Sequence, residues 1–132
     1  MKVADFMTTE VVSVEIPGNR DDVLKILKRT GISGVPVLKE GKIVGIITRK
    51  DLLRKADETQ LGLLMTRNPV TVSPDTPAEE AAQILIENNV RRLPVVSGEK
   101  LVGLLSVADL VHAIAQMRIK DEIKPYYVSQ TF

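Results

Sequence analysis

The chain has 132 residues, 44% of them apolar, and its 18 basic and 17 acidic side chains nearly cancel. This length suits one compact domain or two intimately joined halves and excludes a long tandem array. Scattered charge and a low aromatic content (two Phe, two Tyr, no Trp) disfavour nucleic acid as a partner. The absence of cysteine and the presence of a single histidine disfavour disulfides, thiolate catalysis and a zinc cluster.

The sequence contains no candidate membrane segment. No stretch approaches the ~20 apolar residues of a membrane span. The first residues also lack the apolar run that is typical of a signal peptide. We therefore expect a cytoplasmic protein with no membrane partner.

Two copies of one unit fill most of the chain. Residues 7–52 align with residues 65–110 at a constant offset of 58 and without a gap. The register is fixed by identities that fall in order, among them Val12/Val70, Ile26/Ile84, Pro36/Pro94, Gly45/Gly103 and Asp51/Asp109. Because each copy is too small to bury a good core alone, we expect the copies to pack face to face as one module. The predicted boundaries are 1–58 and 59–116 for the copies and 117–132 for a tail.

Each copy begins with an alternating stretch, at 11–14 and at 69–72, that predicts an extended segment or a brief strand. A helix with one apolar face follows in both copies, and Gly31 ends the first of these helices. In the second copy Thr76 is the predicted N-cap, because Pro77 suits the first helical position and a glutamate three residues after Thr76 completes a capping box.

A hairpin follows each helix. Tight turns at 40–41 and 98–99 each separate two apolar runs. A proline early in each first strand cannot donate to the ladder, so we expect it at a strand start or an edge. A closing helix then begins near Leu52 and near Leu110. The predicted fold is of the α/β (α+β) class, with two copies of a strand, helix, strand, strand, helix unit; the tail carries a helix break at Pro125.

Each second strand runs into its closing helix through a Ser/Thr-x-x-Asp motif, Thr48 to Asp51 in the first copy and Ser106 to Asp109 in the second. Backbone N–H groups, a hydroxyl and a carboxylate at such a junction suit the phosphate and the ribose diol of a nucleotide. The same spacing is also a variant capping box, whose side chains satisfy only their own helix. The spacing alone favours the cap.

Arg91 and Arg92 break the repeat, because the first copy has Ser33 and Gly34 at these positions. Two adjacent guanidinium groups can clamp phosphates with planar pairs of donors. A solvated pair of arginines between a helix and a strand is an equal alternative. The two halves therefore need not bind alike.

Two further features recur in both copies: apolar lead-ins at 3–7 and 61–65, and hydrophobic-x-x-hydrophobic-Pro segments at 32–36 and 90–94. Together with the two Gly-x-x-Ser/Thr-x-x-Asp endings, they make the chain resemble the tandem CBS-domain pair, also called a Bateman module, over about residues 1–116. The resemblance implies two βαββα repeats packed about a pseudo-twofold axis, with two clefts between them.

The resemblance also implies a function. Such modules are regulatory binders of an adenosine ligand (AMP, ADP, ATP or S-adenosylmethionine), without catalysis and with no required cofactor. Carried over by motif, the favoured cleft would use Ser106 at the phosphate, Asp109 at the ribose, Arg91 and Arg92 beside the phosphates, and Val3, Ala4 and Ser33 near the base. The second cleft would use Thr48 and Asp51, with Gly34, Gly62 and Val90 around the base and Lys50 at the phosphates.

Modules of this kind commonly form homodimers, and we expect one here through the exposed faces of the closing helices. The rival hypothesis is a structural module with empty clefts, whose tail docks a regulated partner protein. An enzyme would need a general base or a metal cluster beyond Asp51 and Asp109, and the sequence suggests neither.

Overall fold

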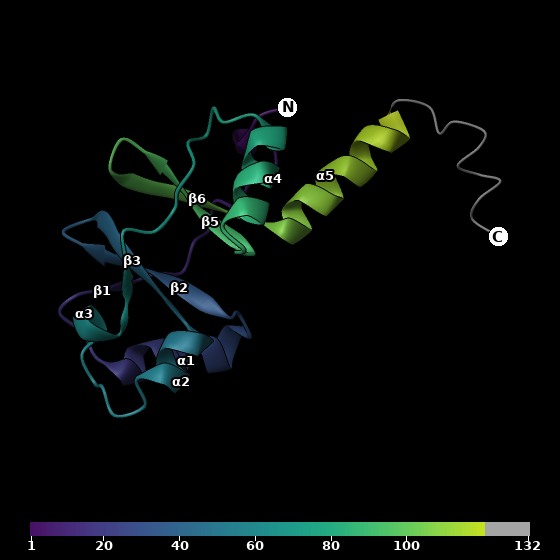
Figure 1. The fold of residues 1–132 in the computed structure, drawn as a ribbon. Coiled ribbons are helices and arrows are strands. Elements are labelled where there is room, and N and C mark those ends of the chain that lie inside the picture. The colour runs from purple at the N-terminus through teal and green to yellow at the C-terminus, as the bar shows by residue number, and fades with distance from the viewer. Residues whose placement is uncertain (121–132) are drawn as a thin grey trace, which may run out of the picture.

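The computed structural model describes residues 1–120 and the side chains of residues 1–116. Within this part, two βαββα units join their strands into one sheet (Figure 1), which confirms the predicted fold. The first unit contains β1 (Val14–Glu15), α1 (Arg20–Thr30), β2 (Gly34–Lys39), β3 (Lys42–Thr48) and α2 (Arg49–Arg54). The second contains α4 (Ala78–Glu87), β5 (Arg92–Ser97), β6 (Lys100–Ser106) and α5 (Val107–Lys120), and a single bridge from Val72 to Val95 stands in the place of its first strand. The lead-ins form η1 (Val3–Asp5), α3 (Leu61–Leu64) and β4 (Thr66–Arg67). The predicted break at Pro125 lies outside the described residues.

Both predicted hairpins are present, β2 with β3 and β5 with β6. Glu40 and Gly41 adopt positive φ angles of 52° and 81°, which matches the right-handed twist of the strands they connect. Pro94 lies in the edge strand β5, where its carbonyl accepts from the Val72 amide at 3.1 Å. The nitrogen of Pro94 therefore faces away from β6, so its missing donor costs the β5–β6 ladder nothing.

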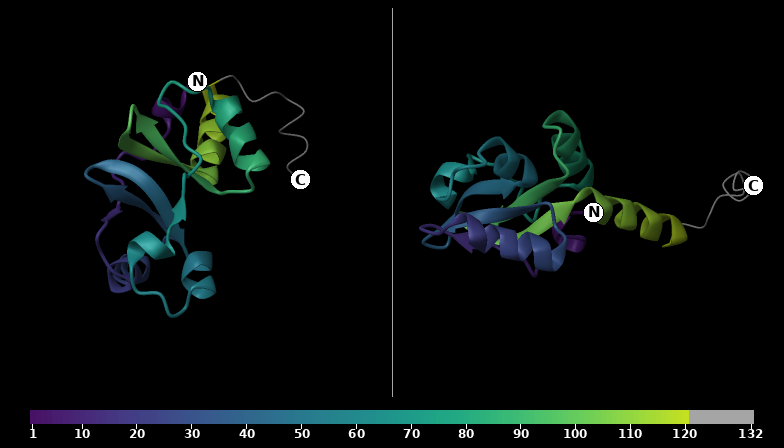
Figure 2. Two further views of the ribbon diagram at one scale, coloured as in Figure 1. Left: turned by 60° about the vertical axis from the view of Figure 1, so that its left-hand side comes forward. Right: turned by 90° about the horizontal axis from the view of Figure 1, so that it is seen from below.

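The two halves are related by a pseudo-twofold axis that passes between Lys42 and Lys100. The sheet order is β1-β2-β3-β6-β5, and β3 meets β6 at the antiparallel pair Lys42 and Lys100. These residues occupy the same position in the two copies. An exposed ion pair, Lys42 Nζ to Glu99 at 2.8 Å, lies beside this junction. Figure 2 shows the halves meeting edge to edge, with α5 projecting beyond the body of the protein.

Each lead-in packs into the opposite unit. Thr8 exchanges backbone hydrogen bonds with Leu104 of β6, and β4 pairs Thr66 with Ile46 of β3. The two hydrophobic cores follow this exchange: α3 and Met65 complete the core of the first unit, whereas Val3, Phe6 and Met7 join the core of the second. Neither repeat therefore closes its core alone, as predicted from its size.

Two glycines make the exchange possible. A Cβ atom at Gly45 would lie 2.7 Å from the Met65 sulfur and 2.8 Å from the Thr66 carbonyl oxygen. A Cβ atom at Gly103 would lie 2.7 Å from the Met7 sulfur. Each Met-Thr pair thus packs against the glycine of the other copy, and the repeat produces this close contact twice.

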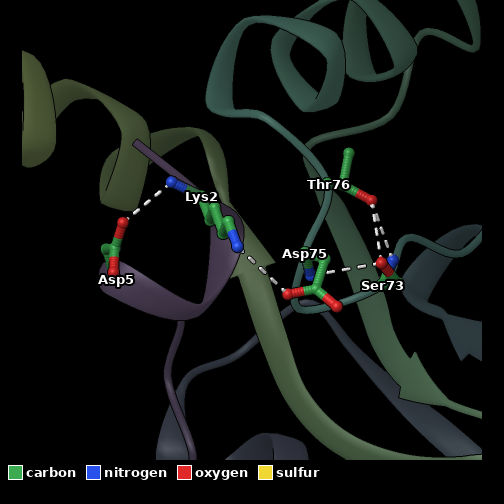
Figure 3. A network of polar contacts seen from close by, with 5 residues as sticks. All are labelled: Lys2, Asp5, Ser73, Asp75 and Thr76. Atoms are coloured by element: carbon green, nitrogen blue, oxygen red, sulfur yellow. Dashed lines mark hydrogen bonds and ion pairs between the residues drawn. The ribbon is translucent and has the colours of Figure 1, made fainter.

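The helix ends agree with the sequence in the first copy and differ in the second. Gly31 ends α1 in the left-handed conformation, at a φ of 74°, as predicted. The N-cap of α4 is Pro77, so the predicted cap at Thr76 is wrong. The Thr76 hydroxyl accepts instead from the Ser73 amide at 3.0 Å, within a turn whose Asp75 meets Lys2 (Figure 3). The Thr76 hydroxyl is therefore occupied by its own turn, while the Thr76 carbonyl accepts from the Val3 amide of the lead-in at 2.9 Å.

Candidate functional site

A cleft of about 910 Å³ lies between the two units. Residues of β2, β3 and α2 form one side together with the 66–70 segment, which begins at the β3 partner Thr66, and residues of α4 and β5 form the other. Its apolar lining includes Ile46, Leu85, Ile86, Val90 and Leu104. The volume falls in the range of sites for small molecules, and the mixture of an apolar wall with a few polar groups is typical of them.

Asp51 is the buried polar group of this cleft, with 5% of its surface exposed. Its Oδ2 accepts from the Thr48 amide at 2.8 Å and from the Thr48 hydroxyl at 3.1 Å. Its Oδ1 accepts from the Thr66 hydroxyl at 3.0 Å. The predicted capping box is thus confirmed, since the Asp51 amide also donates to Thr48 Oγ1 at 3.4 Å. A carboxylate has about four acceptor positions, so Asp51 retains capacity for a ligand hydroxyl.

Ser106 and Asp109 form the equivalent cap of α5. The Ser106 amide donates to Asp109 Oδ2 at 2.8 Å, and the Asp109 amide donates to Ser106 Oγ at 3.1 Å. Asp109 is half-buried. Within the described residues no hydroxyl bond from Thr8 reaches Asp109, although Thr8 is the repeat counterpart of Thr66. Ser106 and Asp109 do not line the 910 Å³ cleft.

The two arginines stand where the halves meet. Arg92 pairs with Ser106 in the β5–β6 ladder, and the Arg91 carbonyl accepts from the Val107 amide at 3.0 Å. The Arg92 guanidinium crosses to the first unit and donates to the hydroxyl of Ser33. The sequence grouped Arg91, Arg92 and Ser33 with the Ser106 motif, whereas in the structure all three line the cleft that contains Asp51.

Some of the remaining predicted residues line this cleft and others do not. Gly34, Lys50 and Val90 line it together with Thr48 and Asp51, as predicted for the cleft of the Thr48 motif.

Three predicted residues lie elsewhere. Val3 is fully buried in the core of the second unit, and Ala4 is exposed, with its amide bonded to the Pro74 carbonyl at 2.9 Å. Gly62 lines a separate hollow of about 350 Å³ beside Pro17.

Several cleft residues were missed from the sequence. Thr66 bonds directly to Asp51, and the repeated Met-Thr pair was the available signal for it. Arg49, Arg54 and Val70 also line the cleft, and nothing in their local sequence marks them.

Metal and membrane features are absent from the described part of the chain. Among these residues no three His, Asp or Glu side chains gather as metal ligands would. No described helix combines the length and the apolar character that crossing a bilayer demands.

Fold and cleft together define a paired-repeat module with a candidate small-molecule site between its halves. The family model of the CBS domain matches residues 3–58 and 61–116, so the chain belongs to the CBS-domain family. The predicted resemblance is thereby confirmed.

Two solved structures are similar over nearly the whole chain. The structure of CBSX2, an Arabidopsis thaliana CBS-pair protein, in complex with AMP is 34% identical, with a TM-score of 0.82, and the match covers 89% of this chain and 98% of that one. The CBS domain pair of protein MJ0100 in complex with 5′-methylthioadenosine and S-adenosyl-L-methionine is 26% identical, with a TM-score of 0.80, over 89% and 98% of the two chains.

A protein of Methanocaldococcus jannaschii, MJ0188, is 34% identical over 116 residues. The match covers 86% of this chain but only 44% of MJ0188. The inosine-5′-monophosphate dehydrogenase of Korarchaeum cryptofilum is 31% identical, and this chain spans 24% of its length. Similar pairs of repeats thus occur both as nearly whole chains and as parts of longer proteins.

Proposed function

We propose that this chain is a regulatory module that binds an adenosine ligand in the cleft lined by Thr48 and Asp51. The observation that carries the proposal is a buried carboxylate with spare acceptor capacity, set in a cleft that both units build. The ligands of two similar pairs, AMP in one and 5′-methylthioadenosine with S-adenosylmethionine in the other, share an adenosine group. The protein needs no further cofactor for this role.

The cleft offers a partner for each part of such a ligand. Asp51 accepts from the ribose hydroxyls, because an ionised carboxylate is an acceptor only. The apolar wall, with Val90 and Ile46, receives the adenine ring. Lys50 and Arg91 lie on the lining where they can meet phosphate oxygens. We place the main ligand here rather than beside Ser106 and Asp109, which remain a second candidate cleft.

Ligand binding can change the arrangement of the two units, because both units form the walls of the cleft. A ligand that touches α2 of one unit and α4 of the other favours the arrangement of the units in which both contacts form. It can shift that equilibrium only by its difference in affinity for the two arrangements. The Arg92 to Ser33 bond joins the two units and both of its residues line the cleft, so a bound ligand would act on it directly.

Titration calorimetry of the purified, ligand-stripped chain against AMP, ADP, ATP and S-adenosylmethionine tests binding. The repeat supplies a matched pair of variants that tests location. Val70 lines the cleft and is 40% exposed, whereas its counterpart Val12 is 38% exposed and does not line it. We expect Val70→Trp to weaken binding by roughly tenfold or more, since overfilling a site costs ~1–3 kcal/mol. Val12→Trp should retain the wild-type affinity.

Absence of heat from folded protein with all four ligands would reject the binding function and favour the rival role in docking a partner protein. Loss of affinity in Val12→Trp alone would move the ligand to the Ser106 and Asp109 cleft.

We also propose a homodimer formed through the closing helices. Leu53 and Val111 hold the same position in α2 and α5, and they are 81% and 59% exposed. Exposed apolar side chains at equivalent places on two helices suit a symmetric interface. Light scattering on the eluting chain should give twice the monomer mass, and Leu53→Glu with Val111→Glu should halve it. A monomer at micromolar concentration would reject the dimer.

A further inference from the structure

The cleft concentrates positive charge. Among the side chains that the structure describes, its lining contains Arg49, Lys50, Arg54, Arg91 and Arg92. Its lining contains one carboxylate, that of Asp51. The chain as a whole is nearly balanced, with 18 basic and 17 acidic residues. The excess of positive charge is therefore a property of this site and not of the protein surface in general.

The repeat shows that none of these cations is duplicated in the other copy. The first copy has Arg49, Lys50 and Arg54 where the second has Val107, Ala108 and His112. The second copy has Arg91 and Arg92 where the first has Ser33 and Gly34. None of the five positions carries Lys or Arg in both copies, yet all five line the same cleft. The departures from the repeat thus add up in one cleft, which is lined by both members of the pairs 33/91 and 34/92 and so lies across the pseudo-twofold axis.

Among the described residues the fold pairs none of these five charges with a carboxylate, although Arg92 donates to the Ser33 hydroxyl. Among residues 1–116 the ion pairs join Lys2 to Asp75 and Lys42 to Glu99, so none of the five takes part in one. Lys50 and Arg54 are four residues apart on α2, a spacing at which like charges destabilise a helix by a few tenths of a kcal/mol. The hydrogen bonds of the Asp51 carboxylate come from Thr48 and from the hydroxyl of Thr66. In the described part of the chain, none of the five cations therefore has a carboxylate partner.

We infer that the cleft selects its ligand by charge: it prefers an adenosine ligand with two or three phosphates over one that is neutral or cationic. This inference rests on the proposed function. Unpaired guanidinium and ammonium groups gain charge-assisted hydrogen bonds to each added phosphate. The same field repels the sulfonium of S-adenosylmethionine, and it adds no contact to those that the adenine and ribose of 5′-methylthioadenosine make.

The test is the affinity series ATP, ADP, AMP, 5′-methylthioadenosine and S-adenosylmethionine, measured by calorimetry on the full chain at low and at raised salt. We expect ATP to bind at least about tenfold tighter than AMP, since one charged hydrogen bond is worth about that factor. The ratio should shrink as salt screens the charges. S-adenosylmethionine should bind more weakly than AMP.

Charge-removing variants connect the selectivity to the cleft. Arg91→Gln and Lys50→Gln should each lower the ratio of ATP affinity to 5′-methylthioadenosine affinity by about tenfold. Arg29→Gln is the matched control, because Arg29 lies on α1 outside the cleft, and it should leave the ratio unchanged.

Saturable binding of 5′-methylthioadenosine as tight as that of ATP would overturn the charge inference and leave the proposed function intact. Failure of every adenosine compound to bind would overturn both.

Discussion

The guanidinium of Arg92 donates a hydrogen bond to the hydroxyl of Ser33, and this bond joins two residues that lie in different repeats. Ser33 is the repeat counterpart of Arg91, so the contact forms close to the pseudo-twofold axis. Both side chains are half-buried, in the cleft where the adenosine ligand is proposed to bind. The junction between the halves and the candidate site therefore share this bond.

Removal of this bond should loosen the junction. We expect Ser33→Ala and Arg92→Ala each to lower the free energy of unfolding by about 1 kcal/mol, as a half-buried charged hydrogen bond would. The double variant should lose less than the sum of the two, because both single changes remove the same contact. Urea unfolding of the four proteins measures this coupling. Fully additive losses would show that the contact contributes nothing.

Because the lead-ins approach the strands closely at two glycines, adding one methyl group there should lower the free energy of unfolding. Gly45→Ala should destabilise the fold by ~1–3 kcal/mol, because the new Cβ atom meets the Met65 sulfur and the Thr66 carbonyl. Gly103→Ala should behave alike against Met7. Gly62→Ala is the control: nothing lies within 4 Å of its Cβ position, and alanine favours the helix α3 that contains it. Thermal unfolding that ranks Gly62→Ala with the other two would contradict the contact.

Asp51 and Asp109 should differ in how much each contributes to the stability of the fold. Asp51 is buried and its carboxylate accepts three hydrogen bonds, whereas the Asp109 carboxylate accepts one in the described part. We expect Asp51→Ala to cost ~2–3 kcal/mol and Asp109→Ala ~1 kcal/mol. Equal midpoints in a denaturant titration would contradict this asymmetry. Asp51→Asn, which preserves the shape of the side chain, should stay folded and bind AMP more weakly than Asp109→Asn does.

The ion pair at the axis predicts a small dependence on pH. A hydrogen bond from Lys42, reinforced by its charge, holds the pKa of Glu99 below its usual range, and Glu99 raises the pKa of Lys42 in return. A lowered glutamate pKa adds stability that is present at neutral pH and is lost as the pH falls through the folded-state pKa. A raised lysine pKa adds stability that is lost only in strong alkali.

Glu99→Gln should therefore be slightly less stable than the wild type at neutral pH, and this difference should disappear in acid, below the lowered folded-state pKa of Glu99, where its carboxyl group is protonated. The difference should also disappear in about 1 M salt, because both side chains are exposed. Denaturation midpoints at the two pH values measure it; a gap that persists at the lower pH would exclude the ion pair as its source.

Local sequence signals predicted the local structure well. The turn at Glu40 and Gly41, the helix stop at Gly31 and the caps at Thr48 and Ser106 all occur as predicted. These features depend on residues within a few positions of one another, so their chemistry is visible in a single stretch of sequence. Thr76 failed as a cap because its hydroxyl accepts from the Ser73 amide three residues earlier, a competing local turn that the capping pattern did not take into account.

The site was harder to predict because its parts come from distant segments. The Thr66 to Asp51 bond and the Arg92 to Ser33 bond each depend on how the two copies pack. The repeat predicted that the copies would pack together, and it also identified Arg91 and Arg92 as departures from symmetry. It could not determine which cleft those side chains line, since their backbone lies beside Ser106 while the Arg92 side chain crosses the axis.

A crystal structure of the full chain with ATP would test the central claim most directly. The account predicts one nucleotide in the 910 Å³ cleft, with a ribose hydroxyl bonded to Asp51, adenine against the wall that contains Val90, and phosphates among Lys50 and Arg91. Nucleotide bound only beside Ser106 and Asp109, with the cleft of Asp51 empty, would contradict it.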